Sequence, residues 1–509
     1  MSTSMSKKPI IWTISGSDCS GGAGIAADIK TGHALGVEVC HLITANTVQN
    51  AEQLLSVNPT EINILQQQVN ILIDDKPPSV IKIGLIANSA QVKWLTTTLA
   101  LIKTKVPTLQ VVFDPVGQAT VGGALSTLQR EDLTDLLMLV DVITPNINEA
   151  QQLTNQTSFT PDILTKKIAE LGVNSVIIKG GHTESLTGIN PEISRDYCLH
   201  HIEEVPIRYQ LTSAKINTHY SHGGGCSFAS ALAAFLAQGY LLRDAFTLTK
   251  AFINQGFAQS VINEINKPNY YGAFEQTHWP DNAINFPTVT SDLAQVHQAL
   301  PAFLSLKLQE KNLGLYPVVN SIYWLKRLLP LGLEIIQLRL KDKTGQELEQ
   351  IIIEALALSK QYKTRLFIND YWQLAIKHGA YGVHIGQEDL QNADLKAIQK
   401  AGLRLGISTH GCYEFLLAQQ LKPSYLAIGA IFSTKTKNMT GQIQGVENLK
   451  YILQLATNIP VVAIGGINHQ HAEQVWQTGV GGIAVVTAIT ESENAEIAVK
   501  QFQHFMPFR

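Results

Sequence analysis

The chain has 509 residues, which allows about two to four domains. Hydrophobic residues make up 45% and charged residues 16%, a composition typical of large, well-buried α/β domains and not of a disordered chain. The net charge of −3 argues against nucleic acid or a membrane surface as partner, so any phosphate must be bound by local groups.

The cysteines have the pattern of a protein from a reducing compartment. There are five, far apart and without the spacing of a metal site: Cys19, Cys40, Cys198, Cys226 and Cys412. The first fifteen residues contain no apolar core of signal-peptide length, and no apolar run is long enough to span a membrane. We expect a soluble cytoplasmic protein that acts on small molecules, with homo-oligomerisation left open.

The N-terminal half alternates apolar runs with helix-like stretches. In chain order the strands are predicted at "IIWTIS", "VIKIG", "LQVVFDP", "DVITPN" and "SVIIKGG", and the loop "THYSHGGGC" then precedes the helix "SFASALAAFLAQ". This alternation is typical of an open α/β sheet with mostly parallel strands. Prolines scattered over residues 267–312 indicate a seam. We expect a first domain over residues 1–275 and a linker over 276–311.

The C-terminal half contains eight strand-like runs, each followed by a helix-like segment. The runs are "LGLYPVV", "EIIQLRLK", "RLFIND", "YGVHIG", "LRLGIST", "YLAIGAIF", "PVVAIGG" and "GGIAVVTAI". Eight such units in about 200 residues predict a closed (β/α)8 TIM barrel over residues 312–509. An open doubly wound sheet is the alternative.

Polar residues gather where these strands end, and barrels build their sites at that face. In "IIQLRLKDKT", Gln337, Arg339 and Lys341 share one face of the strand, because side chains alternate. A solvated sheet face would give the same pattern. Asp370 and Asp389, at neighbouring strand ends, are a natural pair of oxygen ligands for Mg²⁺, although a lone Asp is more often a helix cap. So much charge favours a diphosphate over a monophosphate.

The segment from about Leu313 to Phe505 resembles thiamine-phosphate synthase. The matching motifs are "QLRLK", "FIND", "GVHIGQEDL", "GIST", "STKTK", "QG" at 444–445 and "AIGGI". That family joins hydroxymethylpyrimidine diphosphate to a thiazole phosphate and releases diphosphate. The resemblance implies Mg²⁺ on Asp370 and Asp389, and catalytic roles for Arg339, Ser408 and Lys437. The implied substrate-binding residues are Gln337, Lys341, Asn369, Thr434, Thr436, Gly466, Val486 and Thr487. The chain departs from the family pattern at Asn320, commonly Asp, and at Ala430, commonly Pro.

A second candidate site is the run "HGGGC" before a helix. Backbone N–H groups of a glycine run and the positive end of a helix can surround an anion. Cys226 is expected at that helix start, where a thiol pKa is lowered. A flexible loop with a buried thiol is the alternative interpretation.

About Ile10 to Ala258 resemble hydroxymethylpyrimidine and phosphomethylpyrimidine kinases of the ribokinase-like superfamily. The motifs are "SGSDCSGGAGIAADIKT", "TVQN", "KIGLIA", "FDPV", "ITPNINEA", "IKGGH" and "HGGGC". The resemblance implies ATP as phosphate donor, with Mg²⁺, and Cys226 as base for the substrate hydroxyl. The implied residues are Gly16, Asp28 and Gln49 for the pyrimidine, Asn146, Glu149 and Lys179 for the nucleotide, Asp114 for the metal, and Gly223, Gly225 and Cys226 for catalysis.

This half departs more from its family. Gly224 stands where Thr is common, and "GQATVGG" stands where Met, Lys and Ser–Gly are usual, so the kinase could be slow or altered in preference. His33, His182 and His222 are isolated, and isolated histidines are more often loop or core groups. A pyrimidine-binding regulatory module and a pyridoxal-type kinase are the alternatives. The product of the first half would be the substrate of the second, which favours a bifunctional enzyme of thiamine biosynthesis.

Overall fold

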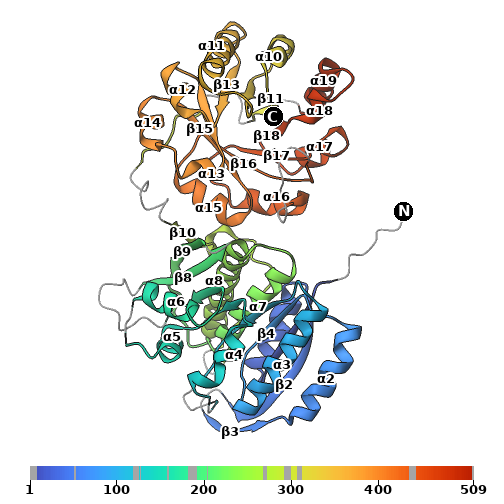
Figure 1. Ribbon diagram of the computed structural model, residues 1–509, viewed down its shortest axis with the longest axis vertical. Helices are drawn as coiled ribbons and strands as arrows, with labels where there is room; N and C mark the ends of the chain where they lie inside the picture. Colours follow the sequence, from blue (N-terminus) through green and yellow to red (C-terminus); the bar gives the residue numbers. More distant parts are fainter. Residues whose placement is uncertain are drawn as a thin grey trace. The chain divides into compact units, whose positions relative to one another are not determined.

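The computed structural model describes residues 8–50, 53–117, 125–126, 128–157, 160–181, 192–202, 205–267, 272–291, 300–306, 312–434 and 443–506. The chain divides into two compact units, Met1–Ser291 and Asp292–Arg509. Figure 1 shows their helices and strands in sequence colours.

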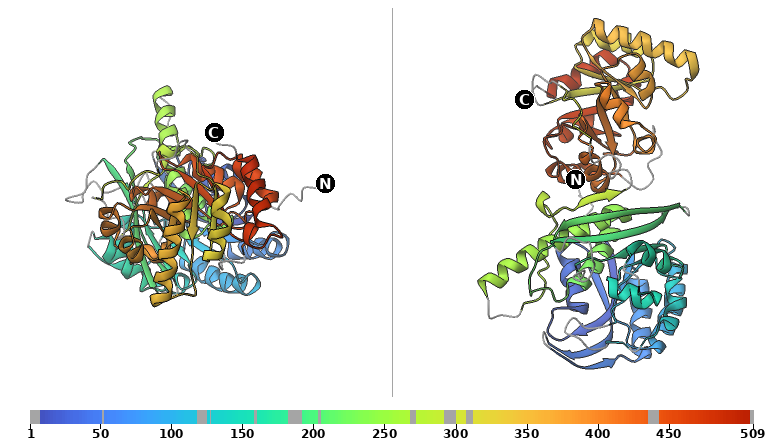
Figure 2. Two further views of the ribbon diagram at one scale, coloured as in Figure 1. Left: turned by 90° about the horizontal axis from the view of Figure 1, so that it is seen from above. Right: turned by 90° about the vertical axis from the view of Figure 1, so that its left-hand side faces the viewer.

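The first unit is built on an open sheet with the strand order β10-β9-β8-β7-β6-β5-β4-β1-β2-β3. In the central part of the sheet, β7-β6-β5-β4-β1-β2, neighbouring strands pair in parallel. At the edges, β3 pairs antiparallel with β2, and β8, β9 and β10 pair antiparallel in turn, beginning at β7. Figure 2 shows β8 and β9 as a long hairpin. The strands are β1 (Ile10–Asp18), β2 (Glu38–Gln49), β3 (Leu54–Pro59), β4 (Val80–Ile83), β5 (Gln110–Phe113), β6 (Val142–Ile143), β7 (Ser175–Ile178), β8 (Ile193–Ile202), β9 (Val205–Ala214) and β10 (Thr288–Ser291).

Helices cover both faces of this sheet. They are α1 (Gly24–Ala34), α2 (Ile62–Asp75), α3 (Ser89–Lys105), α4 (Thr134–Leu137), α5 (Ile147–Thr154), α6 (Pro161–Ala169), α7 (Gly224–Ala237) and α8 (Leu242–Asn266). The apolar side chains of α2 to α6 share one core with Trp12 and Ile14 of β1. Thr13, between them, points to the opposite face, where α1 and α7 pack. The alternation of one strand thus separates an apolar face from a face with buried polar groups.

The second unit is a closed barrel of eight parallel strands in sequence order. Its strands are β11 (Gly314–Val319), β12 (Ile335–Leu338), β13 (Arg365–Asn369), β14 (Gly382–Ile385), β15 (Arg404–Thr409), β16 (Tyr425–Ile428), β17 (Val461–Ile464) and β18 (Gly482–Val485). Its helices are α10 (Ile322–Leu328), α11 (Gly345–Gln361), α12 (Trp372–Lys377), α13 (Gln387–Leu390), α14 (Leu395–Lys400), α15 (Cys412–Gln420), α16 (Gly445–Gln454), α17 (His469–Trp476), α18 (Thr487–Thr490) and α19 (Ala495–Phe505).

The predicted linker, residues 276–311, contributes ordered structure to both units. Its strand β10 pairs with β9 of the open sheet. Residues 300–306 lie at the N-terminal end of the barrel strands, where the Leu306 carbonyl accepts from Tyr381 Oη at 2.7 Å and the Leu304 carbonyl from Ser424 Oγ at 2.7 Å. The side chain of Leu306 joins the barrel core. This segment therefore covers the barrel end opposite the predicted site.

The predicted α/β class is confirmed, with an open sheet first and a closed barrel second, and the open-sheet alternative for the second half is wrong. None of the helices in the described ranges combines the length and the apolar character that crossing a membrane requires.

Candidate active sites

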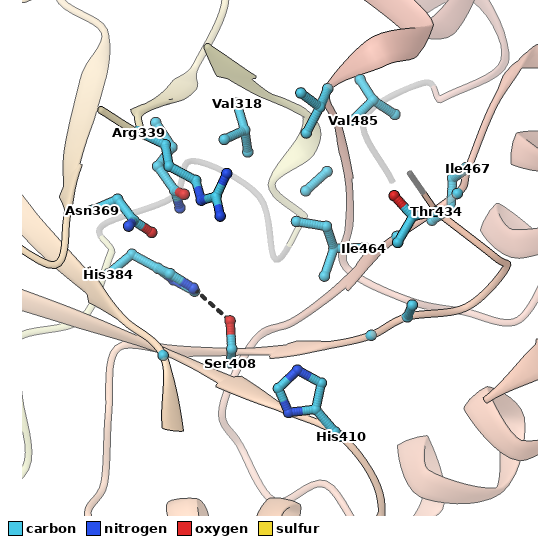
Figure 3. A pocket seen from close by; sticks show the side chains of 18 of the residues that line it. Val318, Arg339, Asn369, His384, Ser408, His410, Thr434, Ile464, Ile467 and Val485 are labelled. Atoms are coloured by element: carbon cyan, nitrogen blue, oxygen red, sulfur yellow. Dashed lines mark hydrogen bonds between the residues drawn. The ribbon is translucent and has the colours of Figure 1, made fainter. Parts of the chain in front are cut away.

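The barrel holds a cavity of about 270 Å³ at the C-terminal ends of its strands. Every barrel residue predicted for the site lies in its lining, except Thr436 and Lys437, which fall outside the described residues. The predicted residues that line it are Gln337, Arg339, Lys341, Asn369, Asp370, Asp389, Ser408, Thr434, Gly466, Val486 and Thr487. Figure 3 shows Arg339 and Asn369 on one side of this cavity and Thr434 and Ile467 on the other.

The row of polar residues beginning in β12 faces this cavity. Gln337 is within the strand and buried, whereas Arg339 and Lys341 follow its last residue, Leu338, and reach the mouth. The neighbours Ile336 and Leu340 are buried in the packed interior. The interpretation of this row as a solvated sheet face is therefore wrong.

Two carboxylates stand side by side at the mouth. The pKa of Asp370 is raised by burial and by the neighbouring Asp389, while Lys341, whose Nζ is 3.6 Å from Asp370 Oδ2, lowers it. Asp370 has φ 65, a left-handed conformation that is uncommon for residues other than glycine and that clusters at functional sites. Excess negative charge on paired oxygens is what a hard divalent cation neutralises, so the donor set fits Mg²⁺.

The loop after β17 brings backbone into close contact with the segment after β16. Gly466 has φ 66, and a Cβ there would lie 2.4 Å from the Ser433 carbonyl oxygen, so only glycine fits. Thr487 begins α18 directly after β18. These are the loops through which barrels of this type bind phosphate.

A buried polar chain that sequence reasoning missed crosses the barrel below the mouth. Gln337 Nε2 donates to Tyr316 Oη at 3.3 Å, and Tyr316 Oη is 2.8 Å from Tyr425 Oη. His384 is 2.7 Å from Tyr425 Oη through Nδ1 and 2.8 Å from Ser408 Oγ through Nε2 (Figure 3). Burial lowers the pKa of His384 to about 4, helped by Arg339, so this imidazole is neutral. The available signal was a side chain able to form a hydrogen bond within an otherwise apolar strand: Tyr316 in β11, His384 in β14 and Tyr425 in β16.

A second histidine that sequence reasoning missed also lines the cavity. His410 follows the end of β15, and its N and Nδ1 are 2.8 Å and 2.9 Å from Glu414 Oε2. The spacing of four residues between them was the available signal, since α15 begins at Cys412.

In the first unit, the glycine run forms the N-terminus of α7. Gly223 is its N-cap with φ 84, and a Cβ there would lie 1.9 Å from the Gly22 carbonyl oxygen. Two glycine-rich loops, around Gly22 and Gly223, therefore pack backbone against backbone. Gly225 lies in the first turn, where a Cβ would be 3.5 Å from Lys179 Nζ. The geometry leaves N–H groups of the first helical turn beside a cation.

The predicted nucleotide and metal residues form one cluster beside this helix. Lys179 Nζ donates to Asp114 Oδ1 at 2.6 Å, and the other Asp114 oxygen has no partner among the described residues. Asn146 and Glu149 cap α5 through reciprocal hydrogen bonds of 2.8 Å and 2.9 Å. Burial raises the pKa of Glu149 to about 7, opposed by Lys179 and reinforced by Asp114. An orphaned, buried carboxylate oxygen near a second carboxyl fits a divalent cation.

The prediction that the helix start lowers the pKa of Cys226 was wrong. Burial raises the pKa of this thiol to about 11, and the nearby Lys82 only partly opposes it. Desolvation disfavours the thiolate more than the helix end favours it. Cys226 is therefore a neutral thiol at neutral pH unless bound ligands change its surroundings.

The residues predicted for the pyrimidine lie on α1, β1 and β2. Asp28 is fully buried and accepts hydrogen bonds from Ser230 Oγ at 2.6 Å, from Lys82 Nζ at 2.9 Å and from Thr13. Gly16 lies against Leu85, whose Cδ2 would be 2.6 Å from an added Cβ. Gln49 ends β2.

His222 links the two glycine-rich loops, a role that the sequence did not reveal. Its Nε2 is 2.8 Å from Asp18 Oδ2, and Asp18 also accepts from the backbone of Ser20 and Ala23 at 2.9 Å and 3.0 Å. Although burial raises the pKa of Asp18, the hydrogen bonds from His222 and Ser20 lower it well below the ordinary value. A charged acceptor thus ties residues 18–23 to the start of α7.

Gly224 is the first residue of α7, and Phe257 lies 3.1 Å from the position of an added Cβ. The aromatic ring fills the space beside this extra glycine, so the loop is packed here. His182 and residues 118–123 fall outside the described residues.

Comparison with known proteins assigns the two units to two families. Residues 18–269 match the family described as phosphomethylpyrimidine kinase, and residues 315–489 match thiamine monophosphate synthase. A thiamine-phosphate synthase from Yersinia pseudotuberculosis is 51% identical over 208 residues, which are 41% of this chain and 95% of that protein.

Two solved structures are similar to the first unit. Phosphomethylpyrimidine kinase from Clostridium difficile is 30% identical with a TM-score of 0.41, covering 49% of this chain and 99% of that one. Staphylococcus aureus pyridoxal kinase with AMP-PCP and pyridoxal is 26% identical with a TM-score of 0.44, covering 56% and 98%. From the family matches and the synthase relative, the chain belongs to the thiamine-phosphate synthase family and carries a phosphomethylpyrimidine kinase domain before it, which makes it a bifunctional enzyme of thiamine biosynthesis.

Proposed function

We propose that the two units act in succession on one pyrimidine. The first would use ATP to phosphorylate hydroxymethylpyrimidine and then its monophosphate. The second would couple the resulting diphosphate to a thiazole phosphate, giving thiamine phosphate and diphosphate. The observation that carries this proposal is the barrel cavity, where two cations, Arg339 and Lys341, stand beside the carboxylate pair Asp370 and Asp389.

In the barrel, the residues at the mouth would stabilise the leaving diphosphate. Arg339 and Lys341 supply fixed positive charge, and Ser408 supplies a hydroxyl already oriented by His384. Stabilising charge that develops in the transition state with preorganised donors is worth about 100-fold to 1,000-fold for one group. The backbone of the Gly466 and Thr487 loops would hold the thiazole phosphate.

In the kinase unit, the first turn of α7 would surround the transferring phosphoryl group. Gly223 and Gly225 supply backbone donors, and Lys179 supplies a cation beside them. Phosphoryl transfer needs mainly positioning and charge neutralisation, so a thiol that is neutral at rest does not preclude activity. The role of Cys226 as the base stays a prediction, and deprotonation of its thiol would have to follow from substrate binding.

Mg²⁺ would be held in the barrel by Asp370 and Asp389 and in the kinase unit by Asp114 with Glu149 near it. Among the described residues no group of three or more His, Cys, Asp or Glu side chains could hold a metal ion alone. Phosphate oxygens and water would complete each coordination shell, as is usual for Mg²⁺. Bound there, the ion would neutralise charge on the phosphates.

We also propose that the enzyme works in the cytoplasm. The support is that all five cysteines are free thiols, as in reducing compartments. Homo-oligomerisation stays a prediction that needs a solution measurement of mass.

The test supplies the full-length chain with hydroxymethylpyrimidine, ATP, Mg²⁺ and thiazole phosphate, and follows thiamine phosphate by chromatography. Its appearance supports both activities. If product forms only from preformed pyrimidine diphosphate, the kinase assignment fails and the synthase assignment stands. If pyridoxal is phosphorylated in preference to the pyrimidine alcohol, the first unit is a pyridoxal-type kinase.

A further inference from the structure

His410 lines the cavity at the mouth of the barrel, two residues after Ser408. Ser408 Oγ faces the lumen, where it meets His384 Nε2 at 2.8 Å. His410, just beyond the last residue of β15, lines the same cavity, and Figure 3 shows its ring beside Ser408.

Glu414 fixes the orientation of this ring. Its Oε2 is 2.9 Å from His410 Nδ1 and 2.8 Å from the His410 backbone N, and Glu414 is only 4% exposed. A carboxylate that accepts from Nδ1 keeps a hydrogen on that nitrogen and turns Nε2 away from itself. The contact with Glu414 uses Nδ1, which leaves Nε2 as the ring nitrogen for a ligand in the cavity.

We propose that His410 donates a proton from Nε2 to the diphosphate as it leaves the pyrimidine methylene carbon. This inference rests on the proposed placement of the diphosphate at the barrel mouth. When the C–O bond breaks, both electrons stay on the diphosphate oxygen, which gains one negative charge and becomes more basic. The Nε2 proton passes to a diphosphate oxygen, the neutral ring stays bonded to Glu414 through Nδ1–H, and solvent reprotonates Nε2 after the product leaves.

Two other cavity groups, Arg339 and His384, are poor proton donors. Arginine keeps its protons at any ordinary pH, so Arg339 stabilises charge without transferring a proton. His384 has a pKa lowered to about 4, and both of its ring nitrogens already have partners, Tyr425 and Ser408. Of the two histidines in the described cavity lining, His410 is the one with a nitrogen available.

A purely structural role is the competing explanation, because the contacts of His410 also tie the end of β15 to the first turn of α15. The two explanations differ in their dependence on the leaving group. A proton donor matters most when the leaving oxygen is basic, whereas a packing residue affects all leaving groups alike.

The experiment compares three pyrimidine substrates in single-turnover reactions of the full-length chain. One carries the natural diphosphate, and two carry bisphosphonates with a difluoromethylene bridge (less basic) or a methylene bridge (more basic). With the natural substrate, His410→Gln should lower the rate about 100-fold. The loss should be smaller with the difluoromethylene analogue and larger with the methylene analogue. Glu414→Gln should give the same trend with smaller factors.

The kinase rate of each variant, measured on the same chain, should equal that of the wild type and reports an intact protein. An equal loss with all three substrates, or no loss, would overturn the role of His410 while leaving the proposed function in place. A wild-type chain that forms no thiamine phosphate from the preformed diphosphate would overturn the proposed function and this inference with it.

Discussion

Replacing Gly223 by Ala tests whether the contact between two glycine-rich loops sets the kinase rate. The added Cβ would lie 1.9 Å from the Gly22 carbonyl oxygen, and real Cβ atoms stay beyond 3.0 Å. The loops would therefore have to separate by about 1 Å. Misplacing a catalytic group by that amount costs about 100-fold in rate, or roughly 2.7 kcal/mol in activation free energy.

The chain offers a matched control at the other end of the same helix. Gly239 follows α7 with φ 86, nearly the φ of Gly223, but nothing lies within 4 Å of an added Cβ. Both alanine variants therefore bear the left-handed backbone penalty of about 1–2 kcal/mol. Only Gly223→Ala adds the collision.

The assay measures ADP release with hydroxymethylpyrimidine, together with thiamine phosphate formation from the preformed diphosphate. We expect Gly223→Ala to lose about 100-fold in the first rate and Gly239→Ala to lose at most about twofold, with the second rate unchanged in both. A kinase rate for Gly223→Ala within about threefold of Gly239→Ala would refute the view that this contact positions the anion-binding turn.

Three further predictions concern other contacts. Lys82→Met leaves the Asp28 carboxylate buried without its cation, which costs about 3–5 kcal/mol and should lower the melting temperature of the kinase unit by roughly 6–20 °C. In calorimetry, adding Asp28→Asn to this variant should restore part of the melting temperature. An unchanged melting temperature in Lys82→Met contradicts the argument. Arg339→Ala should lower coupling about 100-fold or more and spare the kinase rate, whereas equal loss of both in a folded chain contradicts separate sites. Burial raises the pKa of Cys226 to about 11, so the thiol stays protonated from pH 6 to 9. The pH profile of the kinase rate should therefore have the same shape in Cys226→Ser as in the wild type. A wild-type profile with an ionisation between pH 7 and 9 that is lost in Cys226→Ser would contradict this prediction.

The barrel site could be predicted because strand order carries spatial information. In a parallel barrel all C-terminal strand ends meet at one face, so residues as far apart as Arg339 and Thr487 could be placed together before any coordinates. This rule could not predict which polar side chains inside the barrel form hydrogen bonds with one another. The contact between Tyr316 and Tyr425 joins side chains 109 residues apart, and an aromatic residue in an apolar strand looks the same whether or not its hydroxyl has a partner.

The kinase site was less predictable for the same reason. Motif resemblance placed Asp114, Glu149 and Lys179 near the nucleotide, and the structure brings them together. The contact between His222 and Asp18 spans 204 residues and connects two loops, so no local spacing reveals it. The direction of the Cys226 pKa shift also depended on burial, which the position at a helix start does not determine.

One charged residue did carry an unused signal. Lys82 lies within "VIKIG", and an isolated lysine inside a central parallel strand must find a buried partner, because both faces of such a sheet are covered. The partner is Asp28, which has protein donors on both oxygens: Lys82 on each, Ser230 on one and Thr13 on the other. A pyrimidine that binds Asp28 would have to displace one of these donors. Pyrimidine binding would then be coupled to the packing of α1 and α7 against β1 and β4. A substitution that changes the Lys82–Asp28 ion pair should therefore also change the affinity for the pyrimidine.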